Sequence, residues 1–216
     1  MLIPNESNDR LLANLNSGKP SMCAYVFSHP NMVEVAGLAG FECFMADMMF
    51  TAHDWDNIAH MVRELMGLKT DWHRLIHLKR FATAEDFPEF ARSVAESTLI
   101  IPTVESEGGL RDLDEIFALD GIRLVWLAAG DISKMLGVPF KYEHPKVLSL
   151  VEGAVKTAQL YGAGVMYNLG LDSPDFDSMA ASAKRFFEMG VQVVGIGAME
   201  WHMQMALEYV RKKALG

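Results

Sequence analysis

The sequence has few cysteines, fewer basic than acidic residues and no long unbroken apolar run. Its two cysteines, Cys23 and Cys43, each lie within an apolar stretch, so we expect buried free thiols and neither a disulfide nor a thiolate metal site. The 28 Asp and Glu residues outnumber the 19 Lys and Arg residues, which gives a net charge of −9. This charge repels phosphate backbones and anionic lipid, so we expect neither nucleic acid nor a membrane as a partner.

Signals for export or for membrane insertion are also missing. The first ten residues, MLIPNESNDR, lack the basic-then-apolar order of a signal peptide. The longest apolar stretch, residues 35–50, is interrupted by Glu42 and Asp47, so it does not have the composition of a transmembrane helix. We therefore expect a cytoplasmic protein.

The composition indicates one folded unit. Hydrophobic residues make up 50% of the 216 residues and charged residues 22%, which is typical of a globular chain with a sizeable core. No internal repeat, low-complexity segment or Gly/Pro-rich linker divides the chain. We therefore expect a single domain over residues 1–216.

Short apolar runs alternate with helical patterns along the whole chain, and this alternation predicts βα units around a parallel sheet. The glycines Gly40, Gly162 and Gly190 each follow an expected helix, where a left-handed cap is common. The expected strands are 22–27, 42–48, 74–79, 98–105, 122–129, 163–170 and 191–197. The expected helices are 6–17, 30–39, 54–67, 84–96, 108–119, 144–162, 173–189 and 199–214.

Strands of this kind fit either an open doubly wound sheet or a TIM-type barrel. An open dinucleotide-binding sheet should carry G-x-G-x-x-G after its first strand, but YVFSHPNMVE at residues 25–34 contains no glycine. The sequence therefore favours an α/β fold of the TIM-barrel type. The seven expected strands are one fewer than the usual eight, and the shortfall lies near residues 68–74.

Polar residues follow the expected strands, and in a barrel these carboxyl ends form the active site. Glu105 and Asp131 follow consecutive strands, about 4.8 Å apart if paired, so their carboxylates could share a hard cation such as Mg²⁺ or Mn²⁺. The alternative is that each acid only caps the helix that follows it. The residues found at the strand ends are Asp47, Lys79 or Arg80, Glu105, Asp131 and Asn168.

One stretch, residues 101–137, resembles the signature of the HpcH/HpaI-type class II pyruvate aldolases, whose relatives include the citrate lyase β-subunit proteins. Its sequence is IPTVESEGGLRDLDEIFALDGIRLVWLAAGDISKMLG. The strand end at 104–106 matches an I-E-[TS] element, residues 119–122 match an a-v-D-G-[IV] turn, and residues 128–137 match G-P-x-D-L-S-x-x-L-G. The likeness extends more weakly over most of the chain.

The resemblance implies a (β/α)₈ barrel in which Glu105 and Asp131 bind a divalent cation. Mg²⁺ and Mn²⁺ are the expected ions, with Co²⁺ as a further option. Backbone N–H groups near Gly130 and Asp131 would then face the carboxylate of a small 2-oxo acid substrate. The resemblance also implies homo-oligomers, commonly hexamers, with C-terminal helices packed between subunits.

The second strand departs from the family pattern. Where the family has D-x-E-H, with an acid that orients a proton-transferring histidine, this chain has Asp47, Met48, Met49 and Phe50. Asp47 remains, and His53 could replace the missing histidine if its loop bends inward. The alternative is that His53 is a surface or capping residue at the start of a helix.

The second departure is that the third βα unit of the family has no counterpart in this chain. Family members usually carry a third strand whose arginine contacts the substrate, but here MVRELMGL leads almost directly into a segment that resembles the fourth strand. Arg80 or Lys79 could supply the missing cation, and Arg74 and His77 lie in the same segment. The alternative for each is ordinary solvent exposure or a salt bridge at the rim.

The function expected on these grounds is that of a metal-dependent carbon–carbon lyase. Such an enzyme cleaves a 4-hydroxy-2-oxo acid to pyruvate and an aldehyde through a metal-stabilised enolate. The alternatives are an oxaloacetate decarboxylase, a degenerate barrel that binds metal or small oxo acids without efficient catalysis, and a citrate-lyase-like enzyme. The last would need a basic patch for coenzyme A phosphates, which we do not find.

Overall fold

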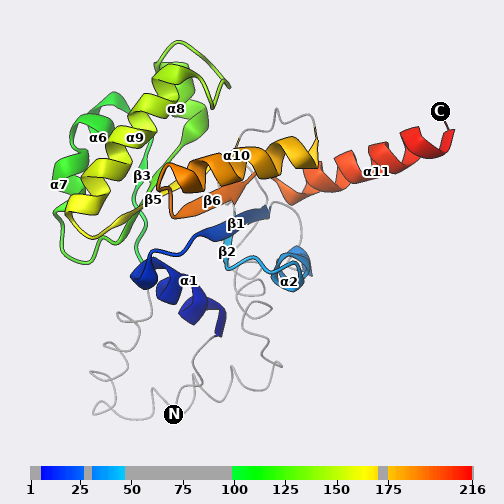
Figure 1. Cartoon of the computed structure of the whole chain (residues 1–216), viewed down its shortest axis with the longest axis horizontal. Coiled ribbons are helices and arrows are strands. Elements are labelled where there is room, and N and C mark those ends of the chain that lie inside the picture. Colours follow the sequence, from blue (N-terminus) through cyan, green and yellow to red (C-terminus); the bar gives the residue numbers. More distant parts are fainter. Residues whose placement is uncertain (1–5, 27–30, 47–98, 170–174, 216) are drawn as a thin grey trace.

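The computed structural model describes residues 6–26, 31–46, 99–169 and 175–215 (Figure 1). These residues form parallel strands joined by helices, so the expected α/β class is confirmed. The strands are β1 (Ser21–Val26), β2 (Cys43–Ala46), β3 (Thr103–Val104), β4 (Leu124–Leu127), β5 (Gly164–Asn168) and β6 (Val193–Ile196). The helices are α1 (Glu6–Ser17), α2 (Asn31–Leu38), α6 (Glu107–Arg111), α7 (Leu113–Phe117), α8 (Ala129–Met135), α9 (Pro145–Leu160), α10 (Phe176–Glu188) and α11 (Met199–Leu215).

The order of the described strands is cyclic. They pair in the order β2-β1-β6-β5-β4-β3, all parallel, so the last strand returns to lie beside the first. In a TIM-type barrel the strands follow one another around the barrel in sequence order. The described strands have this order, and they form a curled half-barrel. The chain between β2 and β3 includes residues 47–98, which lie outside the described residues.

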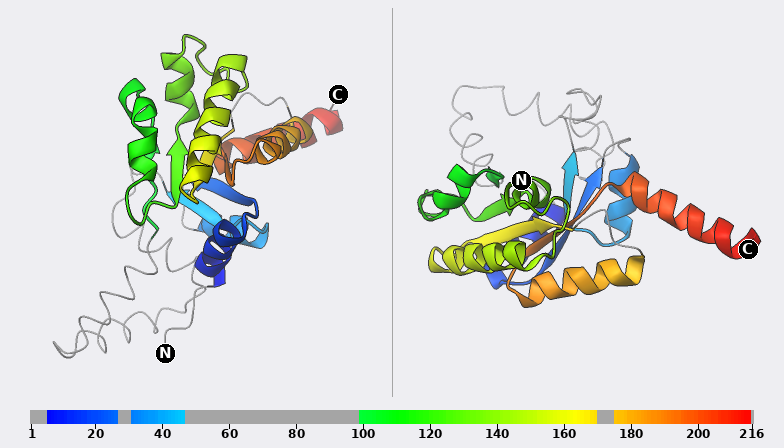
Figure 2. Two further views of the ribbon diagram at one scale, coloured as in Figure 1. Left: turned by 60° about the vertical axis from the view of Figure 1, so that its left-hand side comes forward. Right: turned by 90° about the horizontal axis from the view of Figure 1, so that it is seen from above.

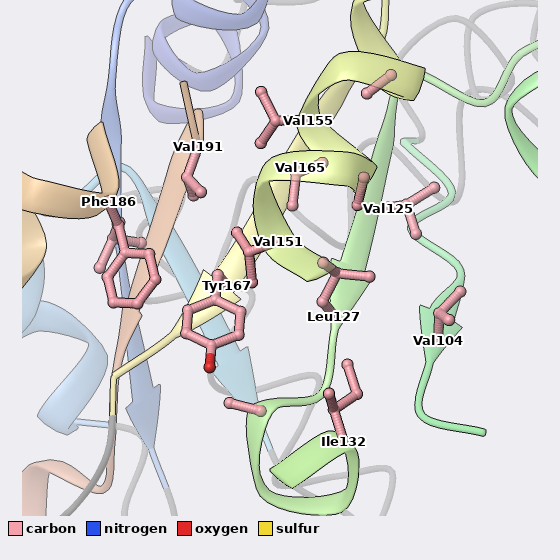
Figure 3. Packing of buried hydrophobic residues seen from close by; sticks show 14 of the residues in the cluster. Val104, Val125, Leu127, Ile132, Val151, Val155, Val165, Tyr167, Phe186 and Val191 are labelled. Carbon is pink, nitrogen blue, oxygen red and sulfur yellow. The ribbon is translucent and has the colours of Figure 1, made fainter. Parts of the chain in front are cut away.

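The two faces of this sheet have different apolar neighbours. Alternate residues of β4 and β5, such as Val125, Leu127 and Tyr167, belong to a large cluster with α9 and α10 on the outer face (Figure 3). Val194 of β6 belongs to the same cluster. The residues between them, including Leu124, Met166 and Val193, belong to a smaller inner cluster that Leu15 of α1 joins. This two-sided burial explains why the strands are continuous apolar runs in the sequence.

Most predicted elements agree with the structure to within a few residues. The first predicted helix coincides with α1, and Gly40, Gly162 and Gly190 adopt positive φ angles of 93°, 64° and 96°, as predicted for left-handed caps. The strand predicted over 98–105 is shorter, because only Thr103–Val104 pairs with β4. Pro102 lacks the N–H that a longer ladder would need.

Two helical predictions need correction. The single helix predicted over 108–119 is two short helices, α6 and α7, separated at Asp112. The helix α8 is absent from the expected helices, because the strand expected over 122–129 overlaps its first residue and residues 130–135 belong to no expected element. The predicted strand 74–79, the predicted helices 54–67 and 84–96, and the predicted loss of one βα unit all lie outside the described residues.

None of the helices in the described part of the chain combines the length and the apolarity that crossing a bilayer requires.

Candidate functional site

The pairing of β3 with β4 brings Glu105 and Asp131 to the same edge of the sheet. Val104 pairs with Leu127, and the amide of Ala128 donates to the carbonyl of Val104 at 3.0 Å. Glu105 therefore leaves β3 beside Ala128, and Asp131 lies three residues further on, in the first turn of α8. Both acids thus follow the carboxyl ends of neighbouring strands, where a barrel carries its active site.

Neither acid is the cap of the helix that follows it. Ser106 caps α6, because its hydroxyl accepts a hydrogen bond from the amide of Gly109 at 3.2 Å. The N-cap of α8 is Ala128, which has no side chain able to cap. The alternative explanation of Glu105 and Asp131 as N-caps is therefore wrong, and both carboxylates remain available for other ligands.

The two carboxylates differ in their surroundings. Glu105 is exposed and makes no ion pair or hydrogen bond with the rest of the described chain. Asp131 lies 3.2 Å from the ammonium of Lys134, an i,i+3 pair in which both side chains are about half exposed (54% and 51%). Such a surface pair contributes only about 0.2–1 kcal/mol, so a divalent cation can displace Lys134 from the carboxylate.

Asn168, at the end of β5, joins the first turn of α8 to the strand beside it. Its Oδ1 accepts one hydrogen bond from the indole Nε1 of Trp126 and one from the amide of Ala129, both at 3.2 Å. Trp126 in turn packs against Tyr25 of β1, with ring centroids 5.9 Å apart. The sequence placed Asn168 at a strand end but gave no indication of these contacts.

Ser133 fixes the other side of the same turn. Its buried hydroxyl donates to the carbonyl of Gly130 at 2.7 Å and accepts from the amide of Phe140 at 3.0 Å. Phe140 has a positive φ of 61°, a conformation that costs energy in a residue other than glycine and that these contacts help to hold. The serine in the 128–137 signature therefore has a structural role.

The donor set fits a hard divalent cation. Two carboxylates at one sheet edge supply oxygen ligands of the type that Mg²⁺ and Mn²⁺ prefer, and water or a substrate oxygen can complete an octahedron. Within the described residues no group of three or more His, Cys, Asp or Glu side chains gathers around one point. Glu105 and Asp131 are the ligands that the sequence analysis predicts at this edge, and their role in metal binding stays a prediction.

Gly130, a predicted substrate-binding residue, lies in the first turn of α8, whereas three other predicted site residues lie outside the described part of the chain. Asp47, His53 and Arg80 lie outside the described residues, as do the alternative cations Lys79, Arg74 and His77. Their assigned roles stay predictions.

The two cysteines lie inside the half-barrel and opposite each other on β1 and β2. Both are free thiols, with Cys23 fully buried and Cys43 half-buried. A hydrogen bond with Cys43, together with burial, raises the pKa of Cys23 well above its ordinary value. A thiol held protonated in this way is a poor nucleophile. Both cysteines are free thiols, as expected from the sequence.

Comparison with known proteins identifies one family. The model of the HpcH/HpaI aldolase/citrate lyase family matches residues 31–196. A curated relative, the 4-hydroxy-2-oxo-heptane-1,7-dioate aldolase of Salmonella typhimurium, is 25% identical over 120 residues, which cover 56% of this chain and 43% of the relative. The matched region thus spans under half the length of this relative.

Solved structures show the same fold. A HpcH/HpaI aldolase/citrate lyase family protein from Burkholderia cenocepacia superposes with a TM-score of 0.76 at 16% identity, over 98% of this chain and all of the other. The citrate lyase β subunit from M. tuberculosis, solved with oxaloacetate and magnesium, has a TM-score of 0.51 at 18% identity, over 85% and 93% of the two chains. At these identities the likeness concerns the fold alone.

Proposed function

Because the chain belongs to the HpcH/HpaI aldolase/citrate lyase family, we propose that it is a divalent-metal-dependent lyase that cleaves a 4-hydroxy-2-oxo acid to pyruvate and an aldehyde. The observation that carries this proposal is that Glu105 and Asp131 follow the carboxyl ends of the paired strands β3 and β4, with neither acid used as a helix cap. The curated relative from Salmonella typhimurium acts on a substrate of this class.

The reaction needs a site that favours the enolate of a 2-oxo acid. The hydroxyl on C4 loses its proton, the C3–C4 bond breaks, the aldehyde leaves, and a proton is later returned to C3 of the enolate. A divalent cation held by Glu105 and Asp131 would supply the Lewis acid that lowers the free energy of the enolate, and this is the larger catalytic effect. Proton transfer by side chains typically contributes a further 10²- to 10⁴-fold.

Three side chains are proposed to assist. Asp47 would orient His53, which would move the proton of the C4 hydroxyl, and Arg80 would supply the positive charge that faces the substrate. The amides of Gly130 and Asp131, at the start of α8, would bind the substrate carboxylate. The roles of Asp47, His53 and Arg80 are separable from metal binding by Glu105 and Asp131, so each of these three side chains can be tested in its own variant.

The exchange of pyruvate methyl protons for deuterium tests the proposal without knowledge of the aldehyde. With Mg²⁺ in D₂O, the protein should accelerate the loss of the methyl signal in the proton NMR spectrum, because enolate formation releases a methyl proton. Chelation of the metal and the Glu105→Gln variant should both abolish this acceleration. If pyruvate binds tightly but no exchange occurs with Mg²⁺, Mn²⁺ or Co²⁺, the chain is a binding protein and the proposed lyase activity is wrong.

The C-terminal helix supports a proposal about assembly. α11 extends away from the sheet in both views of Figure 2, and none of its residues is buried. Met203, Leu207 and Val210 follow one another at helical spacing and are 50–65% exposed. A stripe of this kind on a projecting helix fits burial against a second copy of the chain, so we propose a homo-oligomer, with the hexamer as the assembly that the family resemblance implies.

The double variant Leu207→Glu/Val210→Glu should shift the protein to a smaller species in size-exclusion chromatography with light scattering. The two carboxylates would have to be buried in the contact between copies, which is unfavourable without partners. Lys212→Glu is a matched control, because it changes the charge of the same helix by the same two units on the opposite face. A wild-type protein that is monomeric at micromolar concentration would contradict the proposal.

A further inference from the structure

We infer that Asn168 is a positioning residue for the metal edge, holding the first turn of α8, which carries Asp131, against the ends of β4 and β5. This inference rests on the proposed function, since it concerns the same pair of carboxylates. It follows from one acceptor atom: Oδ1 of Asn168 binds the amide of Ala129 and the indole of Trp126, each at 3.2 Å. Asn168 thereby connects the end of β5 with β4 and with α8.

The bond to Ala129 replaces the cap that α8 lacks. The first amides of a helix have no partner within the helix, and they usually bond to a Ser, Thr, Asp or Asn at the N-cap. Here the N-cap is Ala128, so the side chain that accepts from the first turn comes from another strand. Since α8 has only seven residues, its own hydrogen bonds stabilise it weakly, and tertiary contacts of this kind determine its direction.

Asp131 lies two residues after the amide that Asn168 holds. Ser133 fixes the turn from its other side, through the carbonyl of Gly130 and the amide of Phe140. Asp131 therefore lies between two points of attachment, one of which depends on Asn168. Without Asn168, the amide of Ala129 loses its acceptor, and the start of α8 is free to turn away from β5.

The amide of Asn168 is itself held in place. Trp126 donates to the same Oδ1 while its ring packs against Tyr25, 5.9 Å between centroids at an interplanar angle of 58°. The neighbouring position on β6 is Gly195, where an added Cβ would lie 3.4 Å from Cβ of Asn168 and 3.0 Å from the ring of Tyr25. A glycine at this point leaves the room that both side chains occupy.

Asn168→Leu removes the acceptor at nearly constant size, and Asn168→Asp keeps it. Mutation of a residue that orients the metal ligands without binding the metal typically lowers metal affinity by about 10- to 100-fold. We therefore expect Asn168→Leu to weaken Mn²⁺ binding by about this factor in isothermal titration calorimetry on the full chain. Asn168→Asp should restore affinity to within a few-fold of the wild type, because its carboxylate still accepts both hydrogen bonds.

Tyr167→Phe is the matched control. Tyr167 is the preceding residue of β5, and its hydroxyl donates to the carbonyl of Tyr142 at 3.0 Å on the outer face. The control loses the hydrogen bond to Tyr142 but keeps both hydrogen bonds of Asn168, so its Mn²⁺ affinity should equal that of the wild type. Equal affinities for Asn168→Leu and the wild type, or equal losses in Asn168→Leu and Tyr167→Phe, would overturn the inference.

Amide hydrogen exchange separates this inference from the proposed function. In Asn168→Leu, exchange at Ala129 should be faster than in the wild type and in Asn168→Asp, whether or not metal is present. If the wild type binds no Mn²⁺, the proposed function fails, and the exchange rate at Ala129 then decides whether Asn168 holds the turn. Unchanged protection at Ala129 in Asn168→Leu would overturn the inference even if the wild type binds Mn²⁺ tightly.

Discussion

Asp131→Asn should lower the metal-dependent rate of pyruvate proton exchange by roughly 10³-fold. The substitution removes one of the two charged ligands of the cation, and the cation stabilises the transition state by several kcal/mol. The side chain keeps its size, and its place in the first turn of α8 does not change. The expected measurement is the initial rate of methyl-signal loss at saturating Mg²⁺. Binding of Mn²⁺ should weaken in parallel.

The ion pair with Lys134 provides the control for this prediction. Asp131→Asn also breaks the 3.2 Å contact with Lys134, so loss of the pair alone must be measured. Lys134→Met removes the same pair and keeps the carboxylate, and it should retain the exchange rate of the wild type. Equal rates in Asp131→Asn and the wild type would contradict a metal role for Asp131, and equal losses in both variants would assign the effect to the ion pair.

Phe186→Ala should lower the free energy of unfolding by about 3–5 kcal/mol. Phe186 of α10 is fully buried in the outer cluster, and its ring lies 4.6 Å from that of Tyr167, centroid to centroid (Figure 3). The substitution leaves a cavity between α10 and the sheet. Since single domains are stable by only about 5–15 kcal/mol, urea denaturation followed by circular dichroism should show a clearly lower midpoint.

Phe176→Ala, in the first turn of the same helix, is the control. Phe176 is 48% exposed, so its removal should cost far less than that of Phe186. Equal losses in the two variants would show that the outer cluster does not stabilise the fold through the packing of Phe186.

The strands were predictable because both faces of the sheet are buried. Continuous apolar runs such as residues 163–167 carry this information locally, and the expected order of elements follows from them. The length of β3 was not predictable from hydrophobicity, since Pro102 interrupts the ladder while the side chains around it remain apolar.

The helix α8 was missed for a physical reason that also bears on the site. A helix start is recognised in a sequence by a capping residue such as Ser, Thr, Asp or Asn. Here the N-cap is Ala128, whose side chain cannot accept a hydrogen bond. The acceptor that holds the first turn is Asn168, which lies on another strand and is distant in the sequence. Contacts of this kind depend on the folded sheet and leave no local pattern.

The candidate site was predictable in part. Glu105 and Asp131 were identified because acids that follow consecutive strands meet at one edge of a parallel sheet, and the register of β3 with β4 agrees with that expectation. The ion pair of Asp131 with Lys134 and the two hydrogen bonds of Asn168 depend on side-chain positions, which spacing alone does not determine.

Anomalous scattering from a crystal grown in saturating Mn²⁺ tests most directly whether Glu105 and Asp131 hold a cation. We expect one manganese peak at the edge of the half-barrel, with a carboxylate oxygen from each of the two residues at bonding distance. A crystal with no peak there, or with the two side chains directed away from each other, would contradict the proposed metal-dependent lyase.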